Sequence, residues 1–310
     1  MSTSASQTVA GLVRPVPTRR RASVRRLAQA LGLHLLAAVI AVVMIFPLVW
    51  MVSTSVKASA EMFIFPPRLL PSRWVLENYT RAWQGARFSR YAANTAAVTI
   101  AGTVLTLVIC AMAAYAFAKL EFRGRNVLFW IVLGSQMIPG IVMLIPQFLL
   151  VKSLPLAGGN DWLGRGGHGW LNSFAVLIIP HAGAAFGVFL LRQFFLSVPD
   201  ELLDAARVDG AGDFRIFGTI VLPLARPALT TLAIFTFQGY WNDFLWPLVV
   251  ISDDRYRTLQ VGLTVFRHRD TTDWGPMMAS ATIATLPMVV VFLLGQRYFI
   301  KGIAVTGIQG

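Results

Sequence analysis

Residues 92–118 read AANTAAVTIAGTVLTLVICAMAAYAFA and contain no Asp, Glu, Lys or Arg. A helix of about 20 apolar residues is long enough to cross the ~30 Å hydrocarbon core of a bilayer. A helix also satisfies its backbone hydrogen bonds internally, which a lone strand in lipid cannot do. The run therefore predicts a membrane-spanning helix.

Five other stretches of the chain have a similar length and apolar character. We place the six spans at about 32–54, 92–118, 127–150, 173–195, 228–251 and 277–299. The sequence does not show the short alternating strands that a membrane barrel would need. The chain is therefore predicted to be an all-α, polytopic membrane protein with six transmembrane helices.

The overall composition agrees with this class. Apolar residues make up 56% of the chain and charged residues 13%, whereas soluble domains have roughly 45–50% and roughly 25%. The net charge of +13 would suggest a nucleic-acid partner in a soluble protein. In so apolar a chain, basic residues that flank membrane spans explain the charge better. We therefore expect the chain to lie in a lipid bilayer and to bind no nucleic acid.

Residues 1–30 differ from the rest because they are basic and contain no acidic residue, the first acid being Glu61. We interpret them as a disordered cytoplasmic tail that orients the first helix. A secretory signal peptide and a mitochondrial transit peptide are the alternatives. With six spans, both termini would lie in the cytoplasm, and residues 31–310 would form one transmembrane domain.

The sequence carries no motif for catalysis. None of the four lysines follows a glycine, so a Walker A motif is absent. The four histidines lack the spacing of an HExxH zinc site, and no Gly-x-Ser-x-Gly elbow occurs. Because Cys110 is the single cysteine, no intrachain disulfide can form. We expect no catalytic residue, no metal site and no cofactor bound by this chain.

A polar stretch at about 196–226 separates the fourth and fifth spans, on the predicted cytoplasmic side. Pro199 and Asp200 suit the start of a helix, and Gly210 suits its end. The expected helix has a small apolar face of Leu202, Leu203, Ala205 and Ala206. Such a helix suits docking into a groove of a partner, and the alternative is an interfacial hairpin on lipid headgroups.

This stretch resembles the EAA loop of bacterial ABC-importer permeases, whose pattern is Glu-Ala-Ala, Asp-Gly-Ala, Phe and Ile-x-Leu-Pro. The matching residues are Asp204, Ala205, Ala206, Asp209, Gly210, Ala211, Phe214, Ile220, Leu222 and Pro223. Asp204 stands where the family has Glu, which keeps the charge and shortens the side chain by one methylene.

Other patches are similar to the carbohydrate-type branch, the group that resembles the G subunit of the maltose permease. They are Asn78-Tyr79, Met137-Ile138-Pro139-Gly140, Phe189 to Phe195, Trp241 to Pro247, Gln296 to Phe299, and the end Gly307 to Gly310, where Gln309 replaces the family's Lys.

The resemblance implies a MetI-like permease domain in the inner membrane of a bacterial cell. The chain would be the transmembrane pore subunit of an ATP-driven importer for a sugar or a related solute. Its partners would be a second permease in a heterodimer, two ATPase subunits that hold ATP and Mg²⁺, and an extracytoplasmic solute-binding protein. Asp204, Ala205 and Ala206 would form the docking face for an ATPase, and Phe214, Leu222 and Pro223 would fix the second helix of the loop.

Polar residues inside the spans are candidates for a solute path: Gln136, Gln238, Asn242 and Asp243. Asp243 is the one acid clearly inside a predicted span, and an intramembrane acid is a functional candidate. Such residues also join helices to one another. The alternative function is a secondary carrier driven by an ion gradient, which would need paired broken helices and more ionisable groups at membrane depth.

Overall fold

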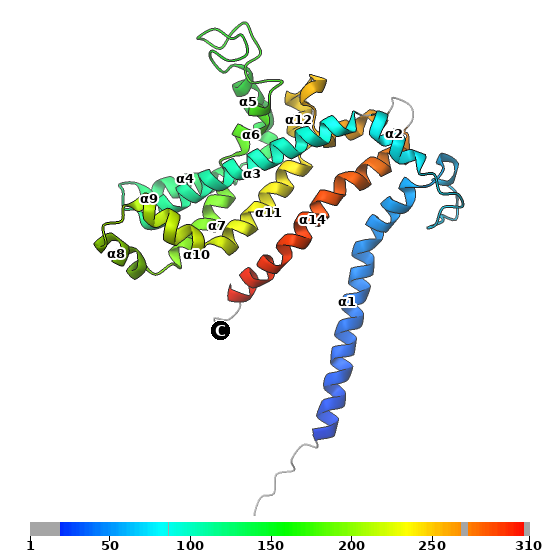
Figure 1. The fold of residues 1–310 in the computed structure, drawn as a ribbon, viewed down its shortest axis with the longest axis horizontal. Helices are drawn as coiled ribbons and strands as arrows, with labels where there is room; N and C mark the ends of the chain where they lie inside the picture. The colour runs from blue at the N-terminus through cyan, green and yellow to red at the C-terminus, as the bar shows by residue number, and fades with distance from the viewer. Residues whose placement is uncertain (1–18, 86, 268–271, 307–310) are drawn as a thin grey trace, which may run out of the picture. The chain divides into compact units, whose positions relative to one another are not determined.

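The computed structural model describes residues 19–85, 87–267 and 272–306. Most of the predicted basic tail, residues 1–18, therefore lies outside the described part. The α-helices are α1 Arg19–Ser55, α2 Glu77–Gly85, α3 Phe88–Lys119, α4 Arg125–Ser135, α5 Gly140–Lys152, α6 Phe174–Ile178, α7 Ala185–Leu196, α8 Asp200–Val208, α9 Asp213–Ile216, α10 Leu222–Leu224, α11 Arg226–Asn242, α12 Leu245–Val250, α13 Leu259–Gly262 and α14 Trp274–Thr306 (Figure 1).

The chain divides into two compact units, residues 1–51 and residues 52–310. The described part of the first unit is helix α1 as far as Met51; this helix begins at Arg19 and not near residue 32. Residues 19–31 contain neither Pro nor Gly and are rich in Arg, Ala and Leu, which favour helix. The prediction of a disordered tail as far as residue 30 therefore differs from the structure at residues 19–30.

Three helices are long and apolar enough to cross a membrane unaided: α1 over Gln29–Ser55, α3, and α14 over Trp274–Gln296. Three further candidates are pairs bent at short breaks: α4 with α5 by 102°, Phe174–His181 with α7 by 45°, and Asp213–Leu224 with α11 by 80°. Six crossings result when each bent pair counts as one. The all-α class and the multi-pass architecture are thus confirmed.

Three predicted spans were wrong as continuous helices. The third breaks between Ser135 and Gly140, because Ile138 precedes Pro139 and a residue before proline is disfavoured in the α region. The fourth, predicted over 173–195, breaks between His181 and Ala185. The fifth was predicted to reach residue 251 but ends at Asn242. Asp243 has extended backbone angles there, and its carboxylate accepts a hydrogen bond from the amide of Trp246 in α12.

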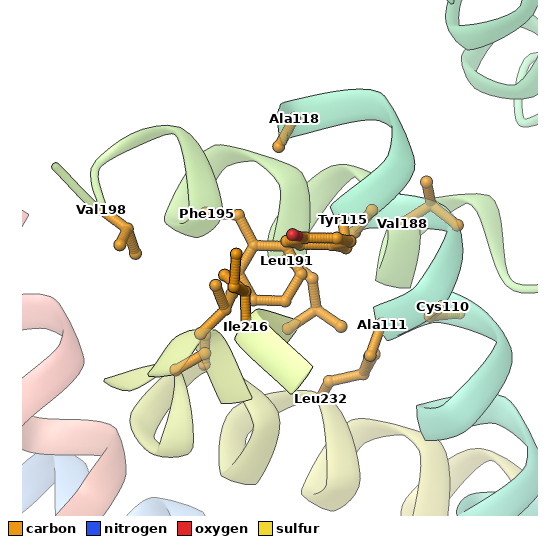
Figure 2. Packing of buried hydrophobic residues seen from close by; sticks show 14 of the residues in the cluster. Cys110, Ala111, Tyr115, Ala118, Val188, Leu191, Phe195, Val198, Ile216 and Leu232 are labelled. Atoms are coloured by element: carbon orange, nitrogen blue, oxygen red, sulfur yellow. The ribbon is translucent and has the colours of Figure 1, made fainter. Parts of the chain in front are cut away.

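Helix α3 forms the centre of the second unit. It packs against α7 and α11, and α14 in turn packs against α11 and α2; Figure 1 shows α3, α11 and α14 side by side. The largest buried cluster joins α3 and α7 to the polar stretch after α7. Figure 2 shows Tyr115, Leu191, Phe195 and Ile216 meeting in this cluster.

Glycine allows two of these helices to approach closely. A Cβ added at Gly102 in α3 would lie 2.5 Å from the ring of Tyr240 in α11. The Tyr240 ring is held in place, since its hydroxyl donates a hydrogen bond to the carbonyl of Ile178 at 3.0 Å. Small residues at helix crossings are typical of membrane proteins, because helices in lipid gain stability by close packing.

Replacing Gly102 by Ala is expected to destabilise the protein by about 1–3 kcal/mol, because the new methyl group would overpack against Tyr240. Thermal unfolding in mild detergent measures the effect. The matched control is Gly134→Ala in α4, where a Cβ would meet nothing within 4 Å, so this variant should be neutral or slightly stabilised. Equal loss of stability in both variants would contradict a close contact at Gly102.

Candidate functional site

Helix α8 is attached to the bundle by one buried side chain. Leu203 is 1% exposed and belongs to the same cluster as Val198, Phe195 and Ile216 (the last three are labelled in Figure 2). Burial of a leucine contributes roughly 2 kcal/mol. Leu203 therefore anchors α8 to both the end of α7 and the end of α9.

The first turn of α8 is tied to the end of α3. The Lys119 ammonium donates to the carbonyl oxygen of Val198 at 2.6 Å and to the Asp200 carboxylate at 2.6 Å. The hydrogen bond from Lys119 holds the pKa of the Asp200 carboxyl below its ordinary value. The carboxylate also lies in the first turn of α8, where the helix dipole favours negative charge.

A glycine ends α8, as the sequence predicts. Gly210 has φ +80°, and its amide donates to the carbonyl of Arg207 at 3.0 Å. The amide of Ala211 donates to the carbonyl of Ala206 at 2.9 Å. These two bonds form a Schellman motif, which requires the left-handed conformation that glycine adopts without strain. The chain thus turns sharply from α8 into α9.

Arg207 holds the two short helices together. Its guanidinium bonds the Asp204 carboxylate at 2.9 Å and lies 3.6 Å from the Asp213 carboxylate. Asp204, the residue that replaces the family's Glu, is therefore paired within the loop and still exposed to solvent. We call residues 197–216 the α8–α9 segment.

Four apolar side chains of the α8–α9 segment face solvent: Leu202, Ala205, Val208 and Phe214. We call them the outer face. Val208 is 87% exposed and Phe214 is 82% exposed. The predicted apolar face of α8 is therefore divided, because Leu203 and Ala206 pack inward while Leu202 and Ala205 point outward.

Two residues of the loop lie differently from the outer face or from their predicted role. Ala206, which the resemblance places on the docking face, is half-buried and packs against the buried cluster, as Ala211 does. Phe214 was predicted to fix the second helix but is exposed; Phe217 does this instead, with its ring 5.0 Å from that of Tyr115. Val208 was missed, although the spacing of residues 202, 205 and 208 could have indicated it.

The remaining loop residues lie where the segment meets α11. Ile220 and Leu222 are half-buried, and Pro223 is exposed. Residues 217–221 form a π-helical turn just before the 80° bend into α11. Motion of the α8–α9 segment would therefore reach α11 through this turn.

A cavity of about 360 Å³ lies between α3, the bend before α7, and α11. Its polar lining comes from Thr106, His181, Thr236, Tyr240 and Asp243. Apolar side chains, among them Phe186 and Phe235, complete the wall. A few polar groups in a mostly apolar wall are typical of small-molecule sites, which have volumes of about 300–1,000 Å³.

Only Asp243 of the four predicted path residues lines this cavity. Gln238 and Asn242 are exposed on another side of α11, and the Asn242 amide oxygen accepts a hydrogen bond from Gln260 at 3.3 Å. Gln136 is exposed at the break between α4 and α5. The structure thus separates residues that the sequence grouped by polarity alone.

His181 and Tyr240 were missed as cavity residues. His181 packs edge-on against the ring of Trp246, with centroids 5.5 Å apart. Thr236 and Tyr240 lie one helical turn apart on α11, and Asp243 follows three residues later, just after the helix ends; this spacing could have indicated a shared face. Within the described ranges, no group of three or more His, Cys, Asp or Glu side chains could hold a metal ion.

Apolar helices that cross a membrane several times, a cavity between them and a polar hairpin at one end define a membrane transport subunit. Residues 107–305 match the family described as "Binding-protein-dependent transport system inner membrane component", and the chain belongs to this family. The matched region contains α7 to α11 and hence the α8–α9 segment and every lining residue of the cavity except Thr106.

Curated relatives support this assignment. The chain is 36% identical over 267 residues to a probable ABC transporter permease, YurM, of Bacillus subtilis, covering 86% of this chain and 84% of the relative. It is 31% identical to the diacetylchitobiose uptake system permease NgcG of Streptomyces coelicolor, with 85% and 84% covered. It is 32% identical to the sn-glycerol-3-phosphate transport system permease UgpE of Rhizobium meliloti, with 88% and 95% covered.

Solved structures agree. A chain of a bacterial ABC transporter that imports the acidic polysaccharide alginate has a TM-score of 0.75 and 25% identity, with 92% of this chain and all of that chain covered. The resemblance to carbohydrate-type importer permeases is thereby confirmed. The chain is a multi-pass permease subunit and not an ATPase.

Truncating Leu203 to Ala should release α8 from the bundle, because a buried leucine truncated to alanine costs about 2–5 kcal/mol. Hydrogen exchange over residues 200–209 in the purified protein measures this release. Leu202→Ala is the matched control, because Leu202 is next to Leu203 in sequence but its side chain points to solvent. We expect faster exchange in the first variant only, and identical exchange in both would exclude Leu203 as the anchor.

Proposed function

We propose that this chain is one of two permease subunits of an ABC importer for a sugar or a related polyhydroxylated solute. The second permease would form a heterodimer with it. Two ATPase subunits would carry ATP and Mg²⁺, and an extracytoplasmic binding protein would deliver the solute. Family membership supports this, and so do relatives whose names specify diacetylchitobiose, arabino-oligosaccharides and glycerol 3-phosphate.

The observation that carries the proposal is the outer face of the α8–α9 segment. Exposed aromatic and aliphatic side chains on an ordered surface are typical of protein interfaces. Lipid is a poor partner for this face, because the α8–α9 segment is acidic. It carries five carboxylates, Asp200, Glu201, Asp204, Asp209 and Asp213, against two basic residues, Arg207 and Arg215. Interfacial helices carry Lys and Arg on their polar side, which anionic lipids attract. We therefore assign the outer face to an ATPase subunit.

The anchoring of this segment suits the transmission of force. Leu203 joins α8 to the buried cluster, Lys119 joins it to α3, and Phe217 joins the following turn to Tyr115. Closure of an ATPase pair against the outer face would therefore move α3 and α11 together with α8. A ligand can only shift a conformational equilibrium when its contacts differ between the two states.

The proposed orientation follows from the N-terminal arginines. Basic residues before the first span favour a cytoplasmic N-terminus. Four crossings later, the α8–α9 segment is on the same side, where ATP is available, and after six crossings the C-terminus is also cytoplasmic. The cavity would contact the solute as it passes, with the Thr236 hydroxyl and the Asp243 carboxylate available to sugar hydroxyls.

The substitution Val208→Asp tests the proposed function. A carboxylate on the outer face should abolish co-purification of a Walker A-bearing ATPase and reduce ATP-dependent solute uptake at least ten-fold, while the permease itself remains folded. The matched control is Asn126→Asp, which adds the same charge at an exposed site near the start of α4. Tagged complexes purified from the native host, and vesicles loaded with ATP, provide the two measurements.

Uptake by the unaltered chain in ATP-free vesicles, driven by an ion gradient, would overturn the importer assignment in favour of a secondary carrier. Unchanged ATPase binding in the Val208→Asp variant would overturn the role of the outer face.

The substitution Asp243→Asn tests the cavity. The amide oxygen can still accept the hydrogen bond from Trp246, but the charge facing the cavity is lost. We expect a rise in the KM for uptake of about ten-fold, with ATPase assembly unchanged. Asn242→Ala, on the exposed side of α11, should leave the KM unaltered. Equal KM values for the two variants would exclude Asp243 from the solute path.

A further inference from the structure

The connection between α5 and α6 is a glycine-built loop, residues 153–172. Five of its glycines have positive φ angles: Gly158, Gly159, Gly164, Gly166 and Gly169. A Cβ at Gly169 would overlap the carbonyl oxygen of Val151, and one at Gly164 would overlap that of Ser153. The loop therefore folds back on itself so closely that glycine is required at these points.

Two polar side chains hold the glycine loop in one conformation. Asn160 is buried; its amide nitrogen donates to the carbonyls of Lys152 and Leu154, and its oxygen accepts from the amide of Gly167, all within 2.9 Å. The Asp161 carboxylate accepts from the amides of Leu163 and Arg165, both at 2.8 Å. Hydrogen bonds within the loop and to the end of α5 therefore hold it in one conformation.

This ordered loop presents apolar side chains to solvent. Trp162 is 74% exposed, Leu156 is 82% exposed, and Leu163 is also exposed. A tryptophan on a rigid support loses little conformational freedom when a partner binds. Tryptophan is also among the residues that contribute most to protein interfaces.

The base of the loop is connected to the solute cavity. The Asn172 amide oxygen accepts from the amides of Ser252 and Asp253, just after α12. Within these elements, the Trp246 indole in α12 donates to the carbonyl of Val176 in α6 at 2.8 Å, and its ring contacts His181. A partner bound at the loop would therefore act on the cavity through Trp246, which contacts the lining residues His181 and Asp243.

The location of the loop indicates which partner it meets. It lies between the third and fourth crossings, on the side of the membrane opposite the α8–α9 segment. Figure 1 shows it continuing beyond the C-terminal end of α5, away from the helices. Its tip is thus placed past the end of a membrane helix and not beside it, where lipid chains lie.

We propose that the glycine loop is a docking point for the extracytoplasmic solute-binding protein, with Trp162 as its anchor. The family is dependent on a binding protein, and the loop is a rigid apolar projection on the side where that protein delivers its solute. This inference rests on the proposed importer function and its orientation.

The first test uses the complete importer in lipid nanodiscs with the binding protein from its native host. Trp162→Ala should raise the binding-protein concentration that half-saturates ATPase activity by about ten-fold. Basal ATPase activity and the melting temperature should not change, because Trp162 is exposed and distant in sequence from the α8–α9 segment. Trp74→Ala is the matched control, an exposed tryptophan on the same side but outside the loop, and it should leave the half-saturation value unaltered.

Two results would overturn the inference: equal half-saturation in Trp162→Ala and unaltered importer, or the same rise in Trp74→Ala. The proposed function fails separately, when the unaltered complex shows no ATPase stimulation by any binding protein and no ATP-dependent uptake.

A second test identifies what touches the tip. Cys110 is buried, so a cysteine introduced by Trp162→Cys can be labelled selectively with a photoreactive maleimide in native-host cells. A covalent adduct that mass spectrometry identifies as a solute-binding protein would support the inference. An adduct with phospholipid or with another membrane subunit would overturn it.

Discussion

The close contact of α3 with α7 and α11 is the interaction on which the rest of the structure depends. In lipid, apolar surface alone does not drive helices together, so backbones must approach closely enough for dispersion forces and hydrogen bonds to act. Gly102 against Tyr240 and Gly187 against Cys110 allow that approach. One end of α3 then carries Lys119 and Tyr115, which hold the α8–α9 segment. Its middle carries Thr106, which lines the cavity.

Breaks in the helices position the functional groups. The bend near His181 opens the wall of the cavity, and the end of α11 at Asn242 frees Asp243 to turn toward it. The π-helical turn before Arg226 connects the outer face to α11. The breaks are tolerated because neighbouring side chains and turns satisfy the freed backbone groups.

The α8–α9 segment and the glycine loop are two surfaces that we propose bind partners, and each is held in one conformation by different interactions. A surface that binds a partner reversibly must be ordered beforehand, or binding has to overcome its conformational entropy. The α8–α9 segment is ordered by one buried leucine and by salt bridges, whereas the glycine loop is ordered by backbone contacts and by Asn160. Both then leave large apolar side chains in solvent. The cavity lies between them, in contact with elements from each end.

The sequence by itself determined the class of fold, because apolar runs of spanning length can only be helices in a bilayer. It also determined the boundaries of α8, since proline, acids and glycine act on the local backbone. It could not determine that Ala206 packs inward while Val208 points outward, because the orientation of a short helix depends on the cluster that receives Leu203. Nor could it separate Asp243 from Asn242, because only the packing of α11 against α3 and α7 decides which polar side chain faces the cavity.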